Sequence, residues 1–94
     1  MSSFPTRQIR GALCAKGFLE DQTHHSLHWL VVGGQKRSVR TRLSHGLREY
    51  GDELLGRMAR QMHLRRRELD EFIECPMTRE VYVRLLIDRG VLRI

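Results

Sequence analysis

The feature that most limits the fold is a change in hydrophobic period along the chain. Up to residue 16 apolar residues recur at helical spacing, which predicts a helix over about 5–16. From 18 to 43 the period becomes two, as expected of half-buried strands. Beyond this segment the helical spacing returns. A helix, three strands and further helices predict an α+β domain with helices on one face of a three-stranded antiparallel sheet.

The later helices are predicted over about 47–62, 66–74 and 79–89. Gly51 allows the first of them to begin later, at Asp52, whose negative charge suits the first turn of a helix. Thr78 is expected to cap the last helix, and Gly90 is expected to end it.

A β-hairpin is predicted around Gly33-Gly34, which separates the two alternating runs. A two-residue loop would pair Trp29 with Ser38 and mix apolar with polar groups, so a three-residue loop that pairs Trp29 with Val39 is preferred. This register predicts that His28 lies beside Arg40 on the solvent face. The expected inward set is Leu27, Trp29, Val31, Val39 and Leu43, and the expected outward set is His24, Ser26, His28, Arg40 and Arg42.

The length of 94 residues is that of one domain, and the whole chain, 1–94, is expected to fold as a unit. No apolar run approaches the roughly 20 residues that span a bilayer, and the N-terminus has no leader pattern. A cytoplasmic protein with no membrane partner is the expectation.

Positive charge is concentrated in the middle of the chain, since ten of the 17 basic residues but only three acidic residues lie between 36 and 67. A one-sided positive field attracts polyanions, so RNA is the expected partner. The candidate nucleic-acid-binding residues are Lys36, Arg37, Arg40, Arg42, Arg65, Arg66 and Arg67.

Histidines are the candidate catalytic groups, because imidazole titrates near neutral pH and can both remove and donate a proton. His24 could act as base on an RNA 2′-hydroxyl, with His28 or His45 as acid and Arg40 or Arg42 stabilising the charged phosphorane. A metal site from His24, His25 and His28 would lack the usual thiolate or carboxylate support apart from Asp21, so no metal and no cofactor is expected.

The segment Gln22-Thr23-His24, followed by His25 and a strand from Ser26, resembles the signature of the HicA family of toxins, and Gly17-Phe18 ends the first helix as in that family. The resemblance covers about residues 5–62. It implies a double-stranded-RNA-binding-domain-like α-β-β-β-α fold, metal-independent cleavage of messenger RNA, and neutralisation by a HicB-like antitoxin. By resemblance His24 is the catalytic residue, with His25 as the competing assignment.

Residues 64–94 have no counterpart in the HicA pattern, and they are expected to form a helical extension that could enlarge the core, cover the sheet or form a homodimer surface. Two alternatives to the toxin remain open. One is a non-catalytic nucleic-acid-binding module, and the other is an interaction or inhibitor protein of a mobile element that binds an acidic partner.

Overall fold

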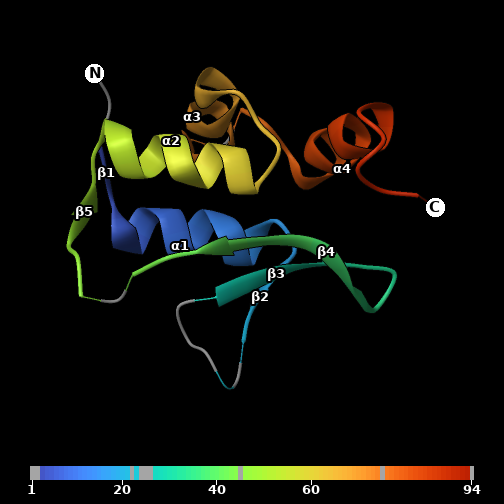
Figure 1. Ribbon diagram of the computed structural model, residues 1–94, viewed down its shortest axis with the longest axis horizontal. Coiled ribbons are helices and arrows are strands. Elements are labelled where there is room, and N and C mark those ends of the chain that lie inside the picture. The colour runs from blue at the N-terminus through green and yellow to red at the C-terminus, as the bar shows by residue number, and fades with distance from the viewer. Residues whose placement is uncertain (1–2, 22, 24–26, 45, 75, 94) are drawn as a thin grey trace.

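The computed structural model describes residues 3–21, 23, 27–44, 46–74 and 76–93, which form an α+β domain (Figure 1). A three-stranded antiparallel sheet has the order β2-β3-β4, and a separate two-stranded pair joins β1 to β5. The predicted fold class is therefore confirmed. In chain order the elements are β1 (Phe4–Pro5), α1 (Thr6–Ala15), β2 (Phe18–Glu20), β3 (Leu27–Val32), β4 (Gln35–Arg42), β5 (Glu49–Tyr50), α2 (Asp52–Gln61), α3 (Arg66–Glu74) and α4 (Arg79–Asp88).

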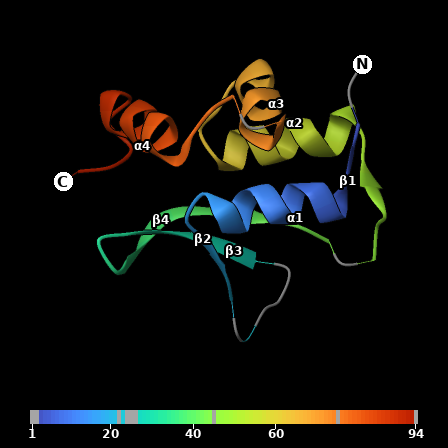
Figure 2. The same ribbon diagram turned by 180° about the vertical axis from the view of Figure 1, so that it is seen from behind.

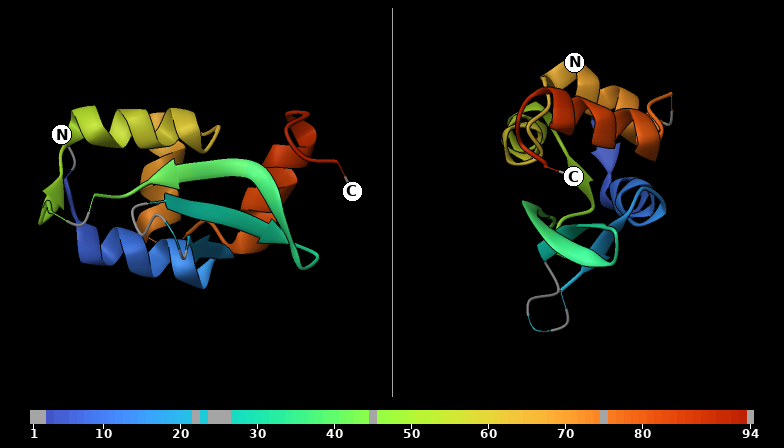
Figure 3. Two further views of the ribbon diagram at one scale, coloured as in Figure 1. Left: turned by 60° about the horizontal axis from the view of Figure 1, so that its bottom comes forward. Right: turned by 90° about the vertical axis from the view of Figure 1, so that its right-hand side faces the viewer.

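The helices lie on one side of the three-stranded sheet, with α1 next to it, and the other face of the sheet points away from them (Figures 1 and 3). Seen from behind, α1 runs alongside β2 and β3 and beneath α2 and α3 (Figure 2). One hydrophobic cluster joins the layers. Eight of its 21 buried apolar residues in the described part of the chain lie after position 63, so the C-terminal helices share the core of the N-terminal part.

The helix ends agree with the sequence prediction to within one or two residues, apart from the start of α2. α2 begins at Asp52, the later start that Gly51 allows. The hydroxyl of Thr78 accepts a hydrogen bond from the backbone N–H of Val81 at 3.2 Å, which caps α4. The pairing of β5 with β1, which ties the start of α2 to the start of α1, was not predicted.

The register of the β3–β4 hairpin differs from the prediction. Gly33 and Gly34, both at positive φ, form a two-residue turn, and Val32 pairs with Gln35. The register then shifts between Val31 and Trp29, so Trp29 pairs with Arg40 and not with Val39. A bulge of this kind changes which residues lie opposite each other without changing the turn.

Because the turn has two residues and not three, the predicted faces of β3 are wrong, although those of β4 are right. His28 is fully buried at 0% exposure, between its cross-strand partners Glu20 on β2 and Thr41 on β4. We call these three residues the inner polar row. The adjacent row on the opposite face, here called the outer row, consists of Leu19, Trp29 and Arg40. At this level the sheet therefore carries polar groups toward the helices, and toward solvent it carries two apolar side chains, Leu19 and Trp29, beside Arg40.

Candidate nucleic-acid interface

The outer row presents a half-buried indole between an exposed leucine and an exposed arginine. Leu19 is 51% exposed. Exposed apolar side chains that cluster on a surface often mark a binding site. The indole N–H of Trp29 donates to Asp21 Oδ2 at 2.9 Å, which fixes the ring orientation. Arg40 Cζ lies 5.2 Å and Lys36 Nζ 5.8 Å from the ring centroid, within the range of cation–π attraction.

The outward side chains of β4 form a line of positive charge. Lys36, Arg40 and Arg42 are exposed, and they lie at even spacing on one face of a strand at the edge of the sheet. Successive outward positions of a strand are about 6.6 Å apart. Because the strand bends at the register shift between Lys36 and Arg40, the backbone holds these cations along a curved track beside Trp29.

A cleft of about 650 Å³ continues this track between β4 and α2. Its described lining contains three arginines and no acidic residue, and Arg40 belongs both to the cleft and to the outer row. The lining residues are Leu27, Arg40, Thr41, Arg42, Tyr50, Leu54, Arg57, Met58 and Gln61.

Hydrogen bonds fix the two walls of the cleft. Gln61 Oε1 on α2 accepts from the hydroxyl of Thr41 at 2.7 Å and from the backbone N–H of Arg42 at 3.0 Å. Tyr50 Oη accepts from the backbone N–H of Ser44 at 2.8 Å, just after β4 ends. The bonds of Gln61 thus tie α2 directly to β4, and the bond of Tyr50 ties the end of β5 to the segment after β4.

Of the four predicted catalytic histidines, only His28 lies within the described residues. His28 was expected at the solvent face, but its buried imidazole cannot contact a surface-bound nucleic acid. Its Nε2 lies 3.8 Å from Glu20 Oε1, and this carboxylate also pairs with Arg10 at 2.9 Å. His24, His25 and His45 lie outside the described residues.

The remaining basic candidates lie in different surroundings. Arg37 falls on the inward side of β4 and is half-buried. Arg66 is held between α2 and α3, because it pairs with Asp52 at 3.2 Å and also with Asp70. Arg65 and Arg67 are exposed at the start of α3. Among the described basic candidates, cation–π contacts to Trp29 are found only for Lys36 and Arg40.

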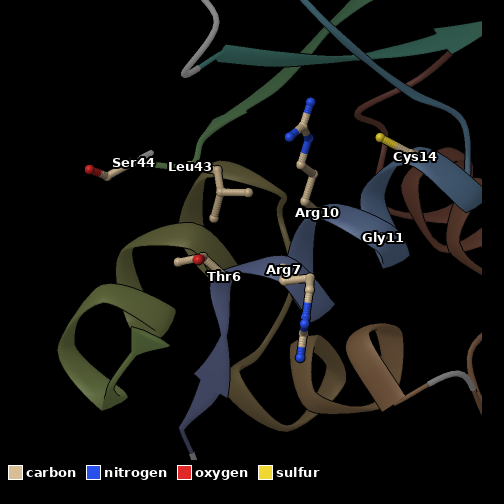
Figure 4. Close-up of a pocket in the computed structure, with 7 residues that line it drawn as sticks. All are labelled: Thr6, Arg7, Arg10, Gly11, Cys14, Leu43 and Ser44. Atoms are coloured by element: carbon tan, nitrogen blue, oxygen red, sulfur yellow. The ribbon is translucent and has the colours of Figure 1, made fainter. Parts of the chain in front are cut away.

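A second hollow of about 480 Å³ lies between α1 and the end of β4 (Figure 4). Its two guanidinium groups do not converge, because the side chains of Arg7 and Arg10 point in opposite directions in this view. Arg10 is also engaged by Glu20. This hollow therefore lacks the focused charge of the cleft beside β4.

Within the described ranges no group of three His, Cys, Asp or Glu side chains could hold a metal ion, and no helix there is long and apolar enough to cross a membrane. Comparisons with protein-family models, with curated proteins and with solved structures gave no match. Two residues of the interface, Trp29 and Arg57, were not among the predicted site residues. The signal for Trp29 was the neighbouring Leu30, whose apolar side chain fits the inward face only if Trp29 points outward.

Proposed function

We propose that the protein binds RNA through the outward face of the β3–β4 hairpin, with Trp29, Lys36 and Arg40 at the centre. The observation that carries this proposal is the outward indole of Trp29 beside two cations. Aromatic rings and guanidinium planes stack on unpaired bases, and lysine and arginine neutralise phosphates. The face supplies both kinds of contact within one short strand pair.

The net charge of +6 supports the same proposal, because electrostatic attraction acts at long range. A positive field speeds the encounter with a polyanion and gives binding that weakens as salt rises. Stacking adds a contribution that salt affects less. RNA binding here is therefore expected to have both a salt-sensitive and a salt-resistant component.

The test uses the fluorescence of Trp29, which is the one tryptophan of the chain. Titration with a single-stranded oligoribonucleotide of mixed sequence should quench this fluorescence, and an end-label on the RNA should report the same affinity by anisotropy. Trp29→Ala should weaken binding by about 1–3 kcal/mol, the usual contribution of one stacked base. Trp29→Phe should restore part of the loss, since a smaller ring still stacks.

The surface is located by comparing Arg40→Ala with Arg67→Ala, because each removes one exposed arginine from a different predicted group. Arg40→Ala should weaken RNA binding more. A greater loss with Arg67→Ala would move the interface to α3 and contradict the proposal. If poly-glutamate displaced the labelled RNA at concentrations as low as those at which unlabelled RNA does so, the result would instead favour an acidic protein partner.

RNA cleavage is a second function, proposed from the HicA resemblance. The histidines of the resembling segment precede β3 by three and two residues, and the first residue of β3, Leu27, lines the cleft described above. A reacting imidazole at His24 or His25 would then act on RNA held by the hairpin face. Neutralisation by a HicB-like antitoxin would follow from coverage of the same face.

A further inference from the structure

We infer that the cleft between β4 and α2 takes the sugar-phosphate backbone and one unpaired nucleotide of a single-stranded RNA, so that single strands are bound and duplexes are not. This inference rests on the proposed RNA binding at the hairpin face and names the form of RNA that this face accepts. It assigns a role to α2, and to Arg57 in particular.

The composition of the cleft favours a nucleotide over other occupants. Arg40, Arg42 and Arg57 supply positive charge, and no acidic side chain is part of its described lining. Behind these cations lie the half-buried apolar side chains of Leu27 and Leu54. A nucleotide combines a flat base of low polarity with an anionic phosphate, so its two parts match the two kinds of wall.

The position of the cleft favours a single strand. Trp29 lies on the outward face of the sheet, whereas the cleft opens at the free edge of β4, and Arg40 contributes to both places. A base stacked on Trp29 and a neighbouring nucleotide in the cleft must therefore be turned away from each other. Unpaired nucleotides can be splayed in this way, whereas paired nucleotides remain stacked within a duplex.

The size of the cleft also disfavours a duplex. A-form RNA presents phosphates and 2′-hydroxyl groups on a broad convex surface, and its deep groove does not admit protein side chains. A cleft of about 650 Å³, whose walls are tied by Gln61, can enclose a nucleotide but not a helix. A duplex would reach only the rim of the cleft, because its stacked bases could not be turned toward Leu27 and Leu54.

The chain offers a matched pair of variants for the test. Arg57 on α2 pairs with Glu53 one turn before it, and Arg84 on α4 pairs with Asp88 one turn after it. Both arginine side chains are well exposed, at 67% and 79%. Exposed helical pairs of this spacing contribute little to folding. Arg57→Ala and Arg84→Ala therefore remove equal charge at similar cost to stability, but only the first changes the cleft.

The experiment measures the affinity of the full chain for one labelled oligoribonucleotide, free and annealed to its complement, over a series of salt concentrations. The free strand is expected to bind at least tenfold more tightly. Arg57→Ala should lower the slope of log affinity against log salt by about 0.7 for the free strand, the value for one phosphate contact. Arg84→Ala should leave this slope unchanged.

Two results would overturn the inference while leaving RNA binding in place. The first is a duplex affinity equal to or greater than that of the free strand. The second is an Arg57→Ala variant that cannot be distinguished from Arg84→Ala. Absence of binding to both forms of RNA would be a different result, because it would remove the proposed function itself.

Discussion

Phe72 is the residue whose truncation best tests whether the C-terminal helices and the sheet form one cooperative core. Its ring is fully buried on α3 and contacts Phe18 of β2 and Tyr82 of α4, with centroid distances of 6.1 and 5.0 Å. The ammonium group of Lys16, just after α1, lies 4.7 Å from the same centroid. Phe72 therefore links the C-terminal helices α3 and α4 to β2 and to the residue that follows α1.

The expected cost of Phe72→Ala is about 3–5 kcal/mol, as for other buried phenylalanines, because apolar burial is lost and a cavity remains. Loss of the cation–π contact with Lys16 places the value in the upper part of this range. Lys16 keeps its hydrogen bond to the carbonyl oxygen of residue 72, which the substitution leaves in place. A domain of this size has a total stability of roughly 5–14 kcal/mol, so the variant should be close to unfolding.

Urea unfolding measures this cost with two independent signals. Far-UV circular dichroism reports mainly the helices, and the fluorescence of Trp29 reports the hairpin. If the core is single, both midpoints fall together in Phe72→Ala, by roughly 1–4 M at the usual dependence on urea. Phe72→Leu should recover part of the loss, and the exposed neighbour change Glu71→Ala should shift either midpoint very little. A hairpin transition that keeps its midpoint while the helical transition moves would refute the single core.

Three further predictions concern other parts of the chain. Arg89 donates a hydrogen bond to Glu68 and lowers the pKa of that carboxyl group below 4.5, so its charge stabilises the fold above this pH and the benefit disappears as pH falls through the lowered value. Glu68→Gln should therefore cost about 1 kcal/mol at pH 7 and almost nothing in strong acid, measured by urea unfolding at each pH. Gly17→Ala should cost about 1–2 kcal/mol in the same assay, because Gly17 has a φ of 98° that L side chains rarely adopt. Cleavage of a mixed RNA pool in the presence of chelator, if it follows the HicA resemblance, should be abolished by His24→Ala and retained by His25→Ala, and the reverse result would assign the role to His25.

The helix boundaries could be predicted because local residues determine them. Gly51 precedes the start of α2, Thr78 caps α4, and Gly90 follows α4 at a φ of 74°. Each of these signals acts within one turn of the chain, so no knowledge of the remaining fold is needed. The two-residue strand Glu49–Tyr50 could not be predicted in this way, because the strand with which it pairs lies more than forty residues earlier.

The hairpin register could not be predicted from alternation alone. Val31 pairs with Lys36 and Trp29 pairs with Arg40, so three residues of β4 lie opposite Leu30. Counting outward from the turn gives the correct pairs only as far as Val31, because the irregularity then changes the register. A three-residue loop places Trp29 opposite an apolar residue only if the strands pair evenly throughout, and they do not.

The inward position of His28 also depends on partners that no local pattern reveals. It lies between Glu20 and Thr41 in the inner polar row, and the row continues to Arg10 of α1 at one end and Gln61 of α2 at the other. Buried polar groups are tolerated where polar neighbours accompany them, and here these neighbours come from four other elements.

Adjacent residues of a strand point to opposite faces, so the inward His28 requires the outward Trp29. The inner polar row thus determines where the aromatic ring of the interface lies. The imidazole of His28, which was predicted to lie at the surface, is buried beneath the sheet. Its inward position places the indole of Trp29 beside Lys36 and Arg40. The residue that carries the proposed RNA binding could therefore be identified only once the partners of its neighbour were known.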